Sequence, residues 1–207
     1  MKEMSKRMKT GTGKTGRPIS FDKDAALEAA MLLFWERGFE GTSIADLTQV
    51  MGLNPSSIYA AFGDKHALFS LAVKRYLYSR SQYATEALAE PTLEKVIRAL
   101  FNNTVAFLTT PGHPPTCMTL GGAMGCSIDA APARDLMTEV RKQNETAIRE
   151  RFLQARKSGE LSKDINVDDY TRYLSSILAG LSVQAANGST KAELRRTAQM
   201  ALRHLGY

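Results

Sequence analysis

The chain has 207 residues, of which 43% are hydrophobic, and its formal net charge is +6 at pH 7. This length and composition suit a globular protein with a sizeable core, whereas no run approaches the roughly 20 apolar residues of a membrane-spanning helix. The first twenty residues are too polar for a secretory signal, and two cysteines do not suggest a disulfide scaffold. We therefore expect a cytoplasmic protein with no membrane partner.

Residues 1–18 form a polar N-terminal arm that we expect to be disordered. Residues 1–20 hold six lysines and arginines against the single acidic residue Glu3, so nearly all of the excess charge lies there. A basic arm attracts polyanions, nucleic acid before an anionic membrane surface, although a solubilising tail has the same composition. Arg17, directly before the first expected helix, is placed to reach a phosphate or a minor groove.

Three helices are expected in the segment 19–66, which we take as one domain. The first spans about residues 22–37, where apolar residues recur at helical spacing. The second starts at Thr42 or Ser43 with a capping-box pattern, and the third starts at Pro55, a residue that suits the first position of a helix. The expected inner positions of the second and third helices are Ile44, Leu47, Val50, Ile58 and Phe62.

The remainder, residues 67–207, is expected to form a second, larger helical domain. A linking helix starts at about residue 65 behind the N-cap Asp64, and the proline-rich segment 110–115 must be irregular. No period-2 strand pattern of useful length occurs. The expected helices of this part cover about residues 64–87, 92–109, 118–127, 132–158, 167–187 and 190–205. The chain is thus predicted to be all-α, with about nine helices.

The second and third helices, with the three-residue turn between them, have helix-turn-helix geometry, although an ordinary helical hairpin is the alternative. In that motif the second helix lies in the major groove of DNA. Small residues at 55–57 would let the backbone approach phosphates or base edges, and Tyr59 could reach a base methyl. The helix starts near Thr42 and Lys65 offer free N–H groups to an anion. The expected DNA contacts are Arg17, Thr42, Ser43, Pro55, Ser56, Ser57, Tyr59 and Lys65.

Residues 17–70 resemble the DNA-binding domain of the TetR family. The residues that carry this resemblance are Ala29, Phe34, Gly38-Phe39, Thr42-Ser43-Ile44, Gly52-Leu53, Ile58-Tyr59, Phe62, Lys65 and Leu68-Phe69. The resemblance implies that residues 43–62 form the DNA-binding segment and that Thr42, Ser57, Tyr59 and Lys65 touch DNA. Residues 55–57 differ from the small or basic residues that are usual in the family at the start of this helix. This difference affects which operator sequence is recognised, but it does not change the expected mode of DNA binding.

Residues 117–205 resemble, more loosely, the helical regulatory domain of one large TetR subgroup. The matching residues are Cys117-Met118, the Gly-Glu-Leu at 159–161 and residues 180–185. The resemblance implies a transcriptional regulator, by family default a repressor, that a small-molecule effector releases from its double-stranded DNA operator.

The helix expected at 167–187 is apolar on one side and carries small residues on another, a pattern that predicts burial of both sides. One side would pack inside the subunit, and the other would meet a symmetry-related copy in a homodimer. A helix wholly inside one subunit is the alternative. The expected dimer interface, shared with the last helix, is Ser175, Ala179, Ser182, Ala186, Leu194, Ala198, Ala201 and Leu202.

The middle of the chain mixes aromatic residues with methionines, which adapt to varied ligands, and Gly121, Gly122 and Gly125 leave room beside them. We expect a cavity for a small apolar effector there, enclosed by the expected helices between residues 64 and 187. A fully packed domain is the alternative. The expected lining is Phe101, Phe107, Leu108, Met118, Met124, Met137 and Tyr173.

The sequence contains no recognisable catalytic constellation or cofactor-binding motif, so no enzymatic activity, cofactor or metal is predicted. Cys117 and Cys126, with His113, Met118 and Met124, form a loose cluster of soft ligands, although ordinary core packing explains such residues as well. The spacing matches no zinc pattern. A soft-metal or thiol-based sensor and a helical small-molecule-binding protein are the alternatives to a DNA-binding regulator.

Overall fold

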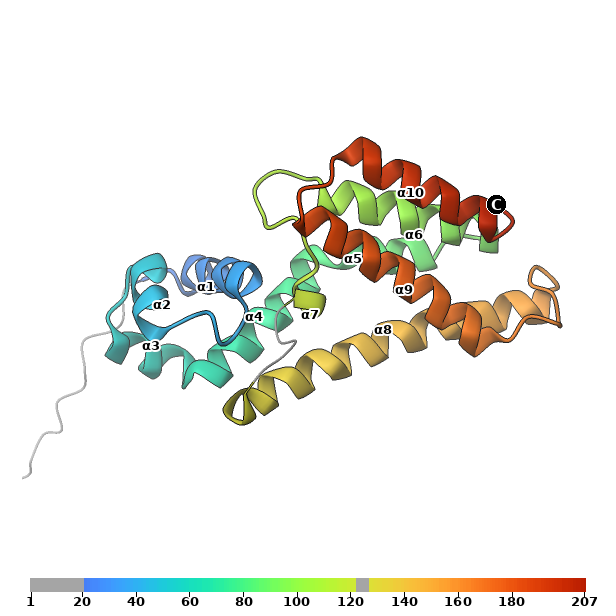
Figure 1. The fold of residues 1–207 in the computed structure, drawn as a ribbon. Helices are drawn as coiled ribbons and strands as arrows, with labels where there is room; N and C mark the ends of the chain where they lie inside the picture. Colours follow the sequence, from blue (N-terminus) through green and yellow to red (C-terminus); the bar gives the residue numbers. More distant parts are fainter. Residues whose placement is uncertain (1–20, 122–126) are drawn as a thin grey trace, which may run out of the picture.

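The computed structural model describes residues 21–121 and 127–207, and most of this part of the chain is helical (Figure 1). The described residues form ten α-helices and one short 3-10 helix, which confirms the all-α prediction. No helix within the described ranges is long and apolar enough to cross a membrane. The arm 1–18 with Arg17, and the predicted residues Met124 and Cys126, lie outside the described residues.

The first four helices begin and end where local chemistry dictates. They are α1 (Lys23–Arg37), α2 (Ile44–Met51), α3 (Pro55–Phe62) and α4 (Lys65–Arg80). The Asp22 carboxylate caps α1, and Ser43 with Asp46 forms the predicted capping box at the start of α2. Gly52 ends α2 with a φ of 65°, a left-handed conformation that favours glycine. The short turn that follows sets α3 against α2.

The helix predicted over residues 64–87 is in fact two helices, α4 and α5 (Gln82–Leu88). The chain turns at Ser81, whose φ and ψ of −99° and 4° depart from α-helical values. The Ser81 hydroxyl donates a hydrogen bond to the C=O of Leu77 at 2.7 Å, and such contacts often bend helices. The prediction of one continuous helix is wrong here because a serine in a polar stretch gives no sequence signal for a break.

The C-terminal part is built from four longer helices and two short ones. They are α6 (Leu93–Leu108), α7 (Met118–Gly121), η1 (Ile128–Ala130), α8 (Ala131–Ser158), α9 (Val167–Ala186) and α10 (Lys191–His204). The long helix α8 runs along one side of the molecule from near α4 to the far end, where the chain turns back into α9 (Figure 1). Helices α9 and α10 then pack on α6.

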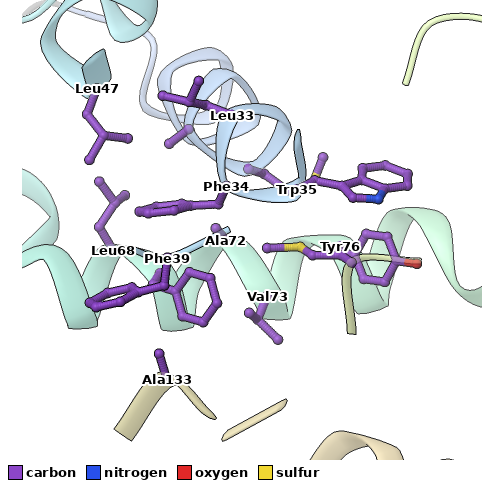
Figure 2. Close-up of a cluster of buried hydrophobic side chains, with 14 of the residues drawn as sticks. Leu33, Phe34, Trp35, Phe39, Leu47, Leu68, Ala72, Val73, Tyr76 and Ala133 are labelled. Atoms are coloured by element: carbon purple, nitrogen blue, oxygen red, sulfur yellow. The ribbon is translucent and has the colours of Figure 1, made fainter. Parts of the chain in front are cut away.

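Two hydrophobic cores hold these helices together. In the first core Phe34 and Phe39 pack between α1 and α4, and Ala133 at the start of α8 closes the core from below (Figure 2). The second core lies among α6, α8, α9 and α10, with Phe101 and Phe152 fully buried. Burying a side chain of this size contributes about 1.5–3 kcal/mol. Because α8 contributes to both cores, the first four helices are packed directly onto the C-terminal part.

Helical spacing predicted the inner faces of the short helices with one exception. Leu47, Ile58 and Phe62 are buried as expected, and Ile44 packs at the edge of the first core. Val50 is instead 43% exposed, because Leu47 and Met51 form the buried face of α2.

Candidate functional site

The exposed side of α3 is the first candidate site. Ile58 and Phe62 are buried against the core, which fixes the opposite side of the helix in solvent. Asn54 caps the helix: its Oδ1 accepts hydrogen bonds from the Ser57 N–H and from the Ser56 hydroxyl, both at 2.8 Å. The first turn of α3 is therefore held in one conformation before any partner arrives.

Three of the predicted contact residues, Pro55, Ser56 and Tyr59, lie together on this exposed side, and Ser57 is half-buried beside them. Tyr59 is 48% exposed although it is the largest side chain of the helix. Its ring can contact a thymine methyl group, and its hydroxyl can donate to or accept from a base edge or a phosphate. The surface fits a groove lined with polar edges better than it fits an apolar partner.

Two lysines lie near the C-terminal end of α3. The Lys65 ammonium, at the first turn of α4, lies 4.3 Å from the centre of the Phe39 ring. Burial lowers the pKa of Lys65, and the charges of Glu40 and Asp46 oppose that shift. Lys23 of α1, which the sequence analysis did not single out, places its ammonium 3.5 Å from the C=O of Ala61 near the end of α3. That contact joins residues 38 positions apart, so local sequence gave no signal for it.

The structure contradicts the prediction that Thr42 contacts DNA. Its side chain is fully buried, and its hydroxyl donates a hydrogen bond to the C=O of Gly38 at 2.7 Å. Thr42 thus closes the turn between α1 and α2.

Ser43 is exposed, but its hydroxyl already accepts a hydrogen bond from the Asp46 N–H at 3.1 Å. Hydrogen bonds from the Ser43 hydroxyl and N–H lower the pKa of Asp46, so this helix start already carries a negative charge.

The second candidate site is a cavity of about 340 Å³ in the C-terminal part. It opens to solvent on one side, where the lining residues Asn144, Glu145 and Ser176 are exposed. Helices α4, α5, α6, α8 and α9 and the segment at Cys117 border it, which agrees with the predicted region. Its apolar lining includes Leu77, Leu88, Leu100, Leu108, Leu120, Ile148 and Leu178. Its polar lining includes Tyr76, Tyr83, Thr104, Cys117, Thr119, Arg141, Asn144, Ser175 and Ser182. The cavity is therefore mixed, not purely apolar.

Of the predicted lining residues within the described ranges, Leu108 alone lines this cavity. Phe101, Met118 and Met137 are fully buried in the hydrophobic cores, and Phe107 stacks on Trp35 with ring centres 5.7 Å apart. Tyr173 is 41% exposed. The prediction of these residues is wrong because large apolar side chains fill the cores, so that smaller and polar residues are left to border the empty space.

The polar end of the cavity is organised around Cys117. The Tyr76 hydroxyl donates a hydrogen bond to its sulfur at 3.5 Å, and the Thr119 hydroxyl lies 3.0 Å from the sulfur. The Arg141 guanidinium donates to the C=O of Thr119 at 2.6 Å. Burial raises the pKa values of Tyr76 and Tyr83 well above that of a free phenol, so both hydroxyls stay protonated near neutral pH.

The predicted dimer interface mostly points into the subunit. Ser175, Ala179 and Ser182 line the cavity, and the predicted residues of α10 belong to the second core: Leu194, Ala198, Ala201 and Leu202. Within the described residues of that prediction, Ala186 alone is exposed. The prediction is wrong because helical spacing separates the faces of a helix but does not tell which face meets its own chain.

The suspected soft-ligand cluster is not assembled in the part of the chain that the structure describes. The His113 ring is stacked against the rings of Trp35 and Phe107, with centres 4.7 Å away in each case. Met118 is buried in the first core. Among the described residues no group of three or more His, Cys, Asp or Glu side chains could hold a metal ion.

Comparisons with known proteins bear on both sites. Residues 26–72 match the family model described as bacterial regulatory proteins, tetR family, and residues 93–201 match the tetracyclin repressor-like C-terminal domain. The HTH-type transcriptional repressor ComR of Escherichia coli (strain K12) is 28% identical over 190 residues, 91% of this chain and 90% of the relative. The repressor BdcR of the same strain is 30% identical over 188 residues, 90% of each chain.

A solved structure extends this likeness to three dimensions. The TetR family transcriptional regulator CifR, a cysteine mutant complexed with 26-bp double-strand operator DNA, matches with a TM-score of 0.87 and 34% sequence identity. The match covers 91% of this chain and 98% of that chain.

Proposed function

The chain belongs to the TetR family of bacterial regulatory proteins, and from this premise we propose how its two sites work together. It is a DNA-binding transcriptional repressor, as its relatives ComR and BdcR are named. In our proposal α3 enters the major groove of the operator, and a molecule bound in the cavity of the C-terminal part releases the protein from the DNA. The observation that carries the proposal is the capped, rigid first turn of α3, which presents Ser56 and Tyr59 to solvent.

The proposed contacts between the protein and its operator are of two kinds, with base edges and with phosphates. Ser56 and Tyr59 read base edges, because hydroxyl groups and an aromatic ring can reach acceptors and thymine methyls in the major groove. Lys65 and Lys23, both near the C-terminal end of α3, bind phosphates and set the register of the helix on the duplex. As a regulator of bacterial genes the protein would act in the cytoplasm, where its DNA lies.

We place the homodimer interface on the exposed face of α9 and α10. Tyr173, Gly180 and Val183 recur at positions that share one side of α9. Met200 of α10, the helix packed next to α9, is 64% exposed. A side chain added at Gly180 would meet no described atom of its own chain within 4 Å, so a second copy can approach the helix closely there. Two copies related by a two-fold axis would present two α3 helices to a palindromic operator.

In our proposal, ligand binding in the cavity is coupled to DNA binding through α4, which reaches from the DNA-facing surface to the cavity. Helix α4 begins beside the DNA-facing surface at Lys65 and lines the cavity farther along at Tyr76. A ligand releases DNA only if it binds better to the conformation in which α3 no longer fits the groove. The mixed lining fits a small molecule with an apolar body and at least one hydrogen-bonding group.

Selection of duplexes from a random pool by the purified protein tests the DNA-binding proposal. Because two equivalent recognition helices act together, we expect an enriched inverted repeat whose half-sites are alike. Recovery of unrelated sequences, without a shared repeat after repeated rounds, would contradict the proposal.

A further inference from the structure

One positively charged side chain borders the cavity without an acidic partner. Arg141 of α8 lines the cavity and is partly buried. Its guanidinium donates hydrogen bonds to two uncharged acceptors, the C=O of Thr119 at 2.6 Å and the hydroxyl of Thr138 at 2.9 Å. None of the ion pairs within the described part of the chain includes Arg141, and the segment 122–126, which follows α7, contains no acidic residue.

Arg141 can still bind a further acceptor. A guanidinium carries five N–H donors in one plane, and two hydrogen bonds leave some of these donors for another molecule. The planar arrangement of donors matches the two oxygens of a carboxylate. An anionic group in the cavity would therefore be held by hydrogen bonds and would also neutralise a partly buried charge.

Several other polar groups of the lining are already bound to one another. The Tyr76 hydroxyl donates a hydrogen bond to the Cys117 sulfur at 3.5 Å, and the Ser182 hydroxyl accepts one from the Cys117 N–H at 2.8 Å. The Tyr83 hydroxyl is hydrogen-bonded to Thr104. These groups have less to gain from a ligand than Arg141 has, so the ion pair with Arg141 is the polar contact that most affects which ligand binds.

The rest of the lining receives carbon atoms. Leucine and isoleucine side chains from several helices border the same space: Leu77, Leu88, Leu100, Leu108, Leu120, Ile148 and Leu178. Removing a hydrocarbon chain from water against such side chains favours binding. A volume of about 340 Å³ lies near the lower end of the range for ligand sites, so the body of the ligand is small.

Glu145 is the charged lining residue that opposes an anion. It lies one turn along α8 from Arg141, but it is exposed at the open side of the cavity. Solvent and salt screen an exposed charge more than a partly buried one, so Arg141 dominates the electrostatics inside the cavity. The single positive charge, with Glu145 nearby, favours a singly charged carboxylate over a phosphate monoester, which carries more negative charge.

We propose that the cavity binds a small aliphatic monocarboxylate, whose carboxylate pairs with Arg141 and whose hydrocarbon chain lies against the leucine side chains of the lining. The inference rests on the proposed function, because it names the chemical class of the molecule that releases the operator.

The test compares probes that differ only in their head group. The probes are the straight-chain carboxylates from butanoate to decanoate, together with the alcohols and amines of the same chain lengths. At pH 7 the acids are negatively charged, the alcohols neutral and the amines positively charged. Calorimetric titration of the full chain without DNA measures the affinity for each probe.

We expect at least one carboxylate to bind the wild type roughly tenfold or more tightly than the alcohol of the same length, as a charge-assisted hydrogen bond provides. The amine of that length should bind more weakly than both. Arg141→Gln should lose the preference for the carboxylate while it binds the alcohol as the wild type does. Lys142→Gln is the matched control, since it removes the same charge from an exposed neighbour and should keep the preference.

Four results would each overturn the proposal. They are the absence of binding for every carboxylate of the series, equal affinity of the wild type for the acids and the alcohols, tightest binding of an amine, and a preference for the carboxylate that persists in Arg141→Gln. Operator binding without a probe shows that each variant is folded. If Arg141→Gln fails that check, the comparison of the head groups on the wild type still decides.

Operator titrations in the presence of the preferred carboxylate separate this inference from the proposed function. We expect the saturated protein to lose affinity for the selected operator. A carboxylate that binds through Arg141 but leaves operator affinity unchanged would support the ligand class and contradict release by a molecule in the cavity.

Discussion

Glu28 of α1 forms ion pairs with two arginines of the linking helix α4. Its carboxylate, 26% exposed, accepts hydrogen bonds from Arg75 and from Arg80, the latter at 2.7 Å. Burial raises the pKa of Glu28, but the hydrogen bonds and charges of the two arginines outweigh burial, so the pKa is lowered overall. A carboxylate with a lowered pKa stabilises the folded state while it is ionised.

Replacing Glu28 by Gln should lower the free energy of unfolding at pH 7 by about 1–2 kcal/mol. The contribution is complete above the unfolded-state pKa of about 4.3 and disappears as the pH falls through the lower folded-state value. Urea titrations at several pH values measure the difference, which should shrink toward zero in acid. Glu36→Gln, on the exposed side of the same helix, is the control and should behave as the wild type. A pH-independent difference for Glu28→Gln would contradict this account.

For individual residues, the sequence predicted which residue types belong to the DNA-facing surface better than it predicted which side chains are exposed. Tyr59 and Ser56 were expected on a DNA-facing surface and lie exposed together, yet Thr42, chosen for the same reason, is buried. A threonine at a helix start can cap, close a turn or face solvent, and only the path of the chain through Gly38 decides among these. The cavity residues were missed for a similar reason, because polar side chains such as Tyr83 and Thr104 carry no periodic signal of enclosure.

Among the elements, α3 depends most on its cap. It has eight residues, and isolated helices of this length are not stable in water. Asn54 satisfies one backbone N–H and orients the Ser56 hydroxyl at the same time. The stability of α3 and the orientation of its DNA-facing hydroxyl therefore depend on the same side chain.

Asn54→Ala should destabilise the protein by about 1 kcal/mol and weaken operator binding, because the first turn of α3 would fray. Asn54→Ser is the matched control, since serine caps helices nearly as well. Thermal unfolding and operator titration check both effects. If the alanine variant is as stable as the serine variant, Asn54 does not act as the cap that the structure indicates.

Most element boundaries could be predicted, because caps are local signals. Ser43, Pro55, Thr92 and Thr190 each mark a helix start that the structure confirms. The break at Ser81 could not be predicted, since α4 ends through a contact with its own backbone and not through a proline or glycine.

At the scale of the whole molecule, the account requires two copies of the chain. Val183, 48% exposed on α9, lies at the centre of the proposed interface. Val183→Glu should place a charge against its own copy across the two-fold axis and shift the protein from twice the chain mass of 22.7 kDa toward the single chain. Light scattering measures the mass. Ile128→Glu, at an apolar position that is 92% exposed on η1, should leave the dimer intact, and a monomeric wild type would rule the interface out.

The sequence located the cavity between the right helices and predicted burial of the apolar side of α9, where Leu174 and Leu181 lie in the second core, but it placed the small residues of this helix in the dimer interface. The small residues at 175, 179 and 182 line the cavity, and the face with Tyr173 and Val183 is left in solvent. Residues recur with the same helical spacing on both faces of α9. The sequence therefore does not show which face is buried inside the subunit, and only the packing of α8 and α10 on α9 decides it.

The most direct test of operator recognition by α3 is the affinity of Tyr59→Ala for the selected operator, measured by fluorescence anisotropy at fixed salt. We expect a loss of about 1–3 kcal/mol, or roughly 5- to 150-fold, with much less effect on shuffled DNA. Tyr78→Ala, which removes an 80% exposed tyrosine from α4, should bind as the wild type does. If Tyr59→Ala binds the operator with wild-type affinity, α3 is not the recognition helix.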